Sequence, residues 1–248
     1  MVRRIVFSLL LGAFVDASIQ TRPVLLRRLD PLLGPSVYHQ TQQNALHDFF
    51  VSTEMNSELS RPHHNWRFLE GTGFPTLHYC NFTGVGCDDD LFVSSLDLNE
   101  TMLAGALPNS MGNLTRLVRF RVFNNTIGGS IPQSLAQISG LRNLNIGHNS
   151  LSGKLPDFSG SVLQRLILDR NSFTGTVPET LCNLHELSAL DLSGSTKLLG
   201  SLPSCLGDLT FLSKLRIADS GLTGSVPTNL CNERVMNVRF HFPTCTPN

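Results

Sequence analysis

The side chains best suited to hold a metal ion gather in the first third of the sequence. His63, His64 and His78 precede Cys80 and Cys87, and all five are common metal-ligand types. Their spacing follows none of the usual zinc patterns, in which paired ligands lie about two to five residues apart. The two cysteines also suit a disulfide, so we expect neither a metal nor another cofactor here.

Three consecutive acids, Asp88 to Asp90, are the second candidate, because paired carboxylates bind cations or exchange protons. A solvated turn before a strand accounts for them more simply. Gly71 and Gly73 are too few for a phosphate-binding loop, and no lysine follows them. The sequence also lacks a nucleophile elbow and a kinase motif. We therefore predict that the protein is not an enzyme.

Charge and targeting patterns limit the partners and the compartment. Lys plus Arg and Asp plus Glu number 19 each, so the net charge is zero, which argues against nucleic acid as a partner. A basic pair, Arg3 and Arg4, precedes mostly apolar residues from Ile5 to Val15. This pattern predicts a secretory signal peptide over residues 1–17. The alternative, a membrane anchor, is disfavoured because the apolar run is too short to span a bilayer.

The rest of the chain fits a released extracellular monomer, in the extracellular space or the cell wall. No later stretch reaches the roughly 18 apolar residues of a spanning helix. Six cysteines are an even number, as expected for disulfides formed in an oxidising compartment. Four Asn-x-Ser/Thr sequons are candidate glycosylation sites: Asn81, Asn99, Asn113 and Asn124.

A repeat with a period of 22 to 25 residues fills most of the chain. Its units read L-x-x-L-x-L-x-x-N-x-L-x-G-x-L-P. They begin at Val93, Leu117, Leu141, Leu163, Leu187, Leu212 and Val235. Within a unit the opening alternates, with Leu144 and Ile146 inward, as in a half-buried strand. Such a period is typical of a solenoid, in which each unit buries its apolar face only against its neighbours.

Three residue columns recur at the bend of each unit. An inward Asn is expected to bond backbone groups that the turning chain leaves unpaired. This column holds Asn125, Asn149 and Asn171, with Thr101, Ser195 and Ser220 as weaker substitutes. The Gly column permits a tight turn and the Pro column fixes the outer side. Their members are Gly105, Gly129, Gly153, Gly175, Gly200 and Gly224, and Pro108, Pro132, Pro156, Pro178, Pro203 and Pro227.

Two units depart from the common length. The unit from Leu141 lacks two residues after Pro156, which predicts a pinched convex side at that coil. The unit from Leu187 has one extra residue, which predicts a bulge at or near Lys197.

The L-x-G-x-I/L-P phrase resembles the plant-type leucine-rich repeat. The resemblance covers Val93 to about Phe240 in six consecutive units. It implies an α/β solenoid, a right-handed superhelix with a concave parallel β-sheet and no catalytic machinery of its own. In this respect the chain is similar to small secreted leucine-rich-repeat proteins and to receptor-like ectodomains.

The segment before the repeats resembles the N-terminal cap of that family, A-L-x-x-[FL]…W…C-x-W-x-G-V-x-C. Ala45, Leu46 and Phe49 lie at helical spacing, Trp66 follows, and Phe82 stands where the motif usually has Trp. The resemblance implies a disulfide between Cys80 and Cys87.

The four other cysteines lie near the C-terminal end. A closing strand from Val235 leads to Cys245, which we pair with Cys231. Cys182 and Cys205 remain and lie on adjacent coils. Six cysteines allow 15 connectivities, so the pairing of these four stays open.

The predicted organisation follows from these boundaries. Residues 1–17 are the signal peptide and 18–39 an extension, either a loose arm or a short amphipathic helix. The N-terminal cap covers 40–92, the six repeats 93–234 and the C-terminal cap 235–248.

A ligand is expected on the concave face, which we define by the third, fifth and seventh residue of each unit. Side chains alternate along a strand, so these three positions point outward. The rows hold six basic residues against three acids, Asp97, Asp169 and Asp191. The alternative is that aromatic residues and Arg are ordinary on any strand surface. The predicted contact residues are Arg119, Arg121, Phe123, Asn143, Asn145, Arg165, Ile167, Lys214, Arg216 and Arg239.

Two functions of different classes fit this sequence. The first is recognition of a protein, a peptide or an acidic glycan in extracellular signalling or defence. The second is a structural role as a glycoprotein of the cell wall or matrix. Only recognition requires the Arg side chains and Phe123 of the concave face.

Overall fold

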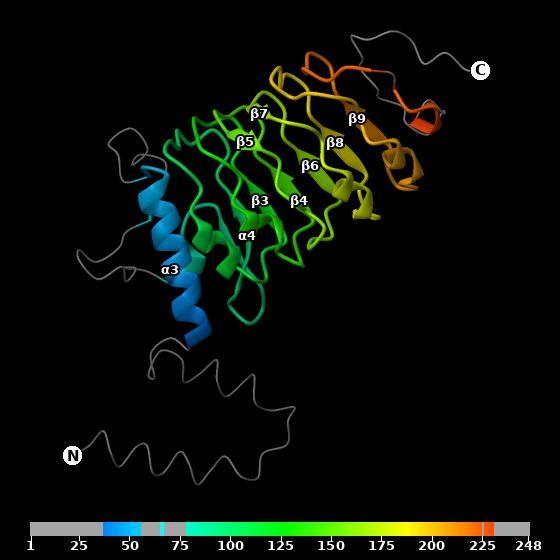
Figure 1. Ribbon diagram of the computed structural model, residues 1–248. Coiled ribbons are helices and arrows are strands. Elements are labelled where there is room, and N and C mark those ends of the chain that lie inside the picture. Colours follow the sequence, from blue (N-terminus) through cyan, green and yellow to red (C-terminus); the bar gives the residue numbers. More distant parts are fainter. Residues whose placement is uncertain (1–36, 56–64, 67–77, 225, 231–248) are drawn as a thin grey trace, which may run out of the picture. The chain divides into compact units, whose positions relative to one another are not determined.

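The computed structural model describes residues 37–55, 65–66, 78–224 and 226–230. The chain forms two compact units, Met1–Gln40 and Thr41–Asn248. The predicted signal peptide, most of the predicted extension and the C-terminal cap lie outside the described residues. The second unit contains the repeats (Figure 1).

Parallel strands from successive repeats form the main sheet. The strands are β2 (Val93–Asp97), β3 (Arg119–Arg121), β4 (Asn143–Asn145), β6 (Arg165–Ile167), β8 (Ala189–Asp191) and β9 (Lys214–Arg216). A further strand, β1 (Val85–Cys87), pairs antiparallel with β2, so the order is β1-β2-β3-β4-β6-β8-β9. Figure 1 shows these strands stacked along the solenoid. The predicted leucine-rich-repeat solenoid with its parallel sheet is confirmed.

Leucines from every coil form one continuous core behind the sheet. Leu96, Phe120, Leu144, Leu166, Leu190 and Leu215 occupy the same inward strand position and are fully buried. Burial of a Leu or Phe side chain is worth about 1.5–3 kcal/mol. Because each of these side chains contacts the coils beside it, the core stabilises neighbours and not isolated repeats.

Each coil bends after its strand through a residue in the left-handed region. The eighth position of the unit has positive φ in Glu100, Asn124, His148 and Arg170, as well as in Gly194 and Asp219. Gly, Asn, Asp and His tolerate that conformation better than other residue types, but Glu100 and Arg170 do not belong to them. The neighbouring coils therefore impose the bend, since the same geometry recurs with different side chains.

The Asn column forms the expected ladder inside the bend. Asn125 Oδ1 accepts from the amides of Thr101 and Leu103 at 3.0 and 2.9 Å. Its Nδ2 donates to the oxygens of Leu98 and Val122, both at 2.9 Å. Asn149 and Asn171 repeat this bridging between coils. The prediction of an inward Asn ladder is confirmed.

The substitutes for Asn behave unequally. Thr101 and Ser220 donate to the backbone oxygens three residues earlier, at 2.7 Å each. Ser195 was expected to do the same, and this expectation is wrong. Its hydroxyl is buried and has no hydrogen-bond partner among the described residues. The extra residue of this coil displaces the turn, which leaves Leu199 60% exposed beyond the bend.

The Gly and Pro columns shape the far side of each coil. Gly153 has a φ of +78°, and the five other members of the Gly column share this left-handed conformation. Gly153 lies in β5 (Ser152–Lys154). This strand pairs with β7 (Ser172–Thr174) in a second, two-stranded parallel sheet that the sequence did not predict. Pro108, Pro132, Pro178 and Pro203 precede short helices, namely η3 (Asn109–Asn113), α4 (Gln133–Ala136), η4 (Glu179–Asn183) and η5 (Ser204–Asp208). A last short helix is η6 (Thr228–Leu230).

The shortened coil from Leu141 has a turn where its neighbours have a helix. No helix follows Pro156 within residues 157–162, where the unit is two residues shorter and a pinched convex side was predicted. The side chains of Gln133 and Gln137 reach from α4 of the preceding coil and donate to Asp157 O at 2.7 and 2.8 Å. These bonds satisfy a carbonyl that the absent helix leaves free.

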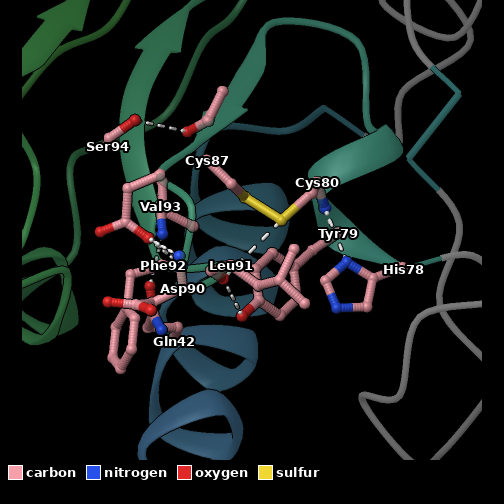
Figure 2. Close-up of a disulfide and its surroundings, with 12 residues drawn as sticks. Gln42, His78, Tyr79, Cys80, Cys87, Asp90, Leu91, Phe92, Val93 and Ser94 are labelled. Carbon is pink, nitrogen blue, oxygen red and sulfur yellow. Dashed lines mark hydrogen bonds between the residues drawn. A yellow bond between two sulfur atoms is a disulfide. The ribbon is translucent and has the colours of Figure 1, made fainter. Parts of the chain in front are cut away.

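The N-terminal cap covers the first edge of the repeats. Helix α3 (Val37–Ser52) begins three residues inside the predicted extension and buries Ala45, Leu46 and Phe49 completely. The helix also contributes Gln42, whose Oε1 accepts from the Val93 amide of β2 at 2.7 Å (Figure 2). That bond satisfies a buried donor at the first repeat.

Aromatic residues pack the inside of the cap. Trp66 stacks on Phe82 with ring centroids 5.0 Å apart and contacts Phe49 at 6.1 Å. Trp66 Nε1 also donates to Thr83 O at 2.8 Å. Phe82 thus fills the position that the cap motif usually gives to Trp. Tyr79, in the short helix η2 (Tyr79–Asn81), donates from its hydroxyl to Leu91 O (Figure 2).

Two disulfides lie within the described residues, the first implied by the cap resemblance and the second a pairing that the sequence left open. Cys80–Cys87 closes the cap beside β1 (Figure 2). Cys182–Cys205 joins η4 to η5 on the convex side of adjacent coils. Cys231 and Cys245 lie outside the described residues, so their pairing stays a prediction.

Candidate ligand-binding face

The parallel ladder aligns the concave face into straight rows. The third-position row runs Ser95, Arg119, Asn143, Arg165, Ala189 and Lys214, each residue being the partner of the next. The fifth-position row runs Asp97, Arg121, Asn145, Ile167, Asp191 and Arg216. The strand register therefore aligns the third- and fifth-position residues in the two rows that the sequence predicts. Arg239 lies outside the described residues.

The first two and the last two residues of the fifth-position row form ion pairs. Arg121 pairs with Asp97 on the strand before it. Arg216 Nη1 lies 3.5 Å from Asp191 Oδ2, also one strand away. The Asp191 side chain is nearly buried and also accepts from the amide and hydroxyl of Ser193. Arg121 and Arg216 therefore carry less available positive charge than the sequence alone would assign them.

A third group on this face links an aromatic ring, a histidine and an acid. The Phe123 ring contacts the His148 ring at 4.7 Å between centroids. His148 Nε2 lies 3.1 Å from Asp169 Oδ2. Burial raises the pKa of Asp169, as does the nearby negative charge of Asp191, and His148 opposes the shift. Gly147 leaves the space that Asp169 occupies, since a Cβ there would collide with its carboxylate.

Three cations of the third-position row have no such compensation. Arg119, Arg165 and Lys214 form no ion pair within the described part of the chain. Arg119 and Arg165 are exposed, and Lys214 is half-buried. Asn145 and Ile167 lie between the two ion pairs of the next row. The face thus offers three unpaired positive charges beside a neutral centre.

His148 is a residue of this face that sequence reasoning missed. It occupies the eighth position of its unit and was not counted among the outward rows. The left-handed bend at this residue, with φ of 52°, turns its side chain back toward Phe123 and Asp169. The residue types Asn, His, Gly and Asp, which tolerate positive φ, recur at the eighth position and are the signal that could have located the bend.

The acidic residues near the cap, which were candidates for binding a cation, instead stabilise a turn. Asp88 Oδ1 accepts from the amides of Asp90 and Phe92, both at 2.9 Å. Arg116 pairs with Asp88 at 3.0 Å and Asp90 at 2.9 Å, and its guanidinium lies over the Phe92 ring. Burial alone would raise the pKa of Asp88, but the bonds from Phe92, Arg116 and Asp90 lower it below 3.8. The acid run is thus a turn fixed by an arginine.

A metal site is not formed by the candidate ligands that can be placed. Cys80 and Cys87 are bonded to each other, and His63 and His64 lie outside the described residues. Over the placed ranges, no group of three His, Cys, Asp or Glu side chains could hold an ion.

The four sequons differ in accessibility. Asn81, Asn113 and Asn124 are exposed. Asn99 lies on the concave face, where Nδ2 donates to Asp97 at 2.7 Å and Oδ1 accepts from the Phe123 amide at 2.8 Å. A glycan on Asn99 would be attached at Nδ2, the atom that donates to Asp97.

In the part of the chain that the structure places, no helix has the length and apolar character required to cross a bilayer.

Comparison with known families gives one match over the N-terminal repeats. The family model described as the leucine-rich-repeat domain of EGF-like domain-containing protein ComC matches residues 91–189. This range runs from the turn before β2 to the start of β8.

Curated relatives come from Arabidopsis thaliana. Receptor protein-tyrosine kinase CEPR1 is 36% identical over 154 residues, which are 60% of this chain and 16% of that protein. The chain spans less than a fifth of the length of the curated relatives it matches.

Solved structures with the same fold include PEPR1–AtPEP1 and RGFR1. The structure of PEPR1–AtPEP1 has a TM-score of 0.69 at 24% identity, over 82% of this chain and 28% of that one. A plant peptide hormone receptor, RGFR1 in complex with RGF2, has a TM-score of 0.58 at 28% identity. That match covers 65% of this chain and 29% of the receptor chain.

Proposed function

We propose that this leucine-rich-repeat chain is a non-enzymatic, extracellular recognition module for a peptide or protein ligand. The ligand binds across the concave face. The observation that carries this proposal is the row of three unpaired cations, Arg119, Arg165 and Lys214, beside the neutral centre of the sheet. Unpaired charges next to an apolar patch are typical of interface anchors.

The similarity to plant receptors supports a ligand-binding role. RGFR1 is a peptide hormone receptor whose structure contains RGF2, and it shares 28% of its residues with this chain over the matched region. CEPR1 is a receptor kinase and matches over the repeats. Because the chain spans only a small part of these proteins, the shared property is the repeat module and not a kinase activity.

We place the module outside the cell as a secreted monomer. The basic and apolar run of residues 1–17 is the basis for secretion. Disulfides at Cys80–Cys87 and Cys182–Cys205 fit an oxidising compartment. Three exposed sequons agree with the same route.

The test compares capture by two forms of the purified protein. One form is wild type, and the other carries Phe123→Ala, Arg119→Gln and Arg165→Gln on the concave face. Both are immobilised and exposed to extracellular extract from the source organism, and the bound species are identified by mass spectrometry. We expect at least one species that the wild type retains and the variant loses.

A control variant separates face-specific loss from general damage. Lys154→Gln with Lys197→Gln removes exposed cations outside the concave face and should retain the ligand. Identical capture by all three forms would contradict recognition through the concave face and favour the structural wall or matrix role.

A further inference from the structure

The three unpaired cations recur on every second coil. Strand pairing puts Asn143 between Arg119 and Arg165, and Ala189 between Arg165 and Lys214. Parallel strands lie about 4.8 Å apart, so successive cations of the row are about 9.6 Å apart at the backbone. The row is therefore a regular charge array and not a cluster.

Positive charge available to a ligand is confined to this array on the described concave face. Arg121 and Arg216 are paired with acids of the same row, and His148 is paired with Asp169. The positive charge of Arg142, the residue before β4, is also compensated, because its Nη1 lies 3.0 Å from Glu186 Oε2. A ligand that binds through charge must consequently match the spacing of Arg119, Arg165 and Lys214.

The repeat distance selects a backbone conformation for a peptide ligand. A polyproline II helix has three residues per turn and rises about 3.1 Å per residue, so every third side chain points the same way at intervals of about 9.3 Å. In a β-strand, side chains on one face are about 6.7 Å apart, and every third side chain points to the opposite face. In an α-helix, side chains seven apart share a face at about 10.5 Å, a mismatch that accumulates along the row.

We propose that the concave face binds a peptide in the polyproline II conformation whose every third residue is acidic. The acidic groups meet Arg119, Arg165 and Lys214 in turn. This inference rests on the proposed recognition function and adds the chemistry and conformation of the ligand. Aspartate, glutamate and phosphorylated or sulfated side chains share the required negative charge.

The centre of the face suits the rest of such a peptide. Ile167 follows Arg165 on the same strand by two residues, and Asn145 is its partner on the neighbouring strand. The acidic side chains point toward the third-position row, so another edge of the helix faces Ile167, where proline rings can pack. A polyproline II backbone has no internal hydrogen bonds, so its carbonyls are available to donors such as the Asn145 amide.

The experiment uses synthetic peptides of one composition and two arrangements. The first contains three Glu-Pro-Pro triplets, so its acids recur every third residue. The second contains the same three Glu and six Pro residues with the acids at every second position. Fluorescence anisotropy with the purified protein measures both affinities at several salt concentrations. We expect the first peptide to bind about tenfold more tightly, with affinity that falls as salt rises.

Matched substitutions identify the row. Arg165→Gln and Lys214→Gln should each weaken binding of the triplet peptide about threefold. Lys154→Gln and Lys197→Gln each remove one exposed positive charge outside the concave face and should leave the affinity unchanged. Far-UV circular dichroism of each variant verifies that the solenoid is intact.

The outcomes separate this inference from the proposed function. Equal affinity for the two peptides, or equal effects of the row and control substitutions, would overturn the polyproline II proposal. If the concave-face variant still loses a species captured by the wild type, recognition stands with another ligand conformation. Binding of an acidic oligosaccharide in preference to both peptides would also overturn it.

Discussion

Asn149 donates a hydrogen bond from Nδ2 to the backbone oxygen of Val122 at 2.9 Å, across 27 residues of sequence. Its Oδ1 accepts from the Ile127 amide of the same preceding coil at 3.0 Å. We predict that Asn149→Leu lowers the free energy of unfolding by about 1–3 kcal/mol, because backbone groups inside the bend lose their partners. Chemical denaturation followed by circular dichroism measures the change.

Ser195 supplies the matched control for that prediction. It occupies the same column, but its buried hydroxyl has no partner among the described residues. Ser195→Ala should leave stability unchanged or raise it slightly, since an unsatisfied polar group is removed. A loss of stability equal to that of Asn149→Leu would contradict the distinction between the two positions.

Asp97 restrains a cation of the ligand-binding face. We predict that Asp97→Asn frees Arg121 and strengthens binding of an acidic peptide about threefold, with a steeper salt dependence. Anisotropy titrations at two salt concentrations measure both effects. Arg121→Gln should act in the opposite direction, because it leaves the Asp97 carboxylate unpaired near the ligand. Weaker binding by Asp97→Asn would show that Asp97 positions other ligand-contacting groups.

The Cys182–Cys205 disulfide joins two coils across 23 residues of sequence. Replacing both cysteines with Ser should lower the free energy of unfolding by about 3.5 kcal/mol, and the same change at Cys80 and Cys87 by about 2.5 kcal/mol, because the longer loop gains more entropy. Urea denaturation of the two double variants tests the order. Thiol alkylation of native wild-type protein should modify no cysteine, and two reactive thiols would contradict full oxidation.

Asp88 should make stability depend on pH at the acidic end. Its folded-state pKa is lowered below 3.8, so its stabilising effect is complete above 3.8 and is lost as the pH falls through the folded-state value. We predict that Asp88→Asn is less stable than wild type near neutral pH and that the two converge below pH 3.8. Urea denaturation across the pH range measures this. Asp89→Asn, at an exposed neighbour, should show no such convergence.

Glycan occupancy should follow side-chain accessibility. In protein expressed through a eukaryotic secretory pathway, we expect carbohydrate at Asn81, Asn113 and Asn124 and none at Asn99. The Asn99 amide is held at both ends by Asp97 and the Phe123 backbone. Glycopeptide mass spectrometry locates the modified residues. Full occupancy of Asn99 would mean that a glycan is attached before this part of the face forms.

The repeat made the architecture predictable from sequence. Period-two alternation within a unit and a fixed spacing between units together determine which residues share a row, and Arg119, Asn143 and Arg165 align as expected. The small sheet of β5 and β7 was not predictable in this way. Ser152 and Lys154 have weak strand propensity, and they pair because stacked coils bring their backbones into register.

The alignment of the concave-face rows was predictable from the sequence, but the ion pairs that neutralise part of their charge were not. Counting six basic residues against three acids treated Arg121 and Arg216 as available, whereas each is paired with an acid one coil away. Such pairs are separated by about a full repeat in sequence and become neighbours only when coils stack. The role of His148 was hidden for the same reason, since its orientation depends on a bend imposed by adjacent coils.

The only tryptophan of the chain, Trp66, lies in the cap, stacked on Phe82 and nearly excluded from solvent. Intrinsic tryptophan fluorescence therefore reports on one end of the protein. The repeats from β4 onward contain no such chromophore, so they can unfold without a change in emission. Fluorescence and circular dichroism should give different denaturation midpoints wherever the two ends of the solenoid lose structure separately. An optical experiment on this protein can thus time the release of the cap independently of the coils that carry Arg165 and Lys214.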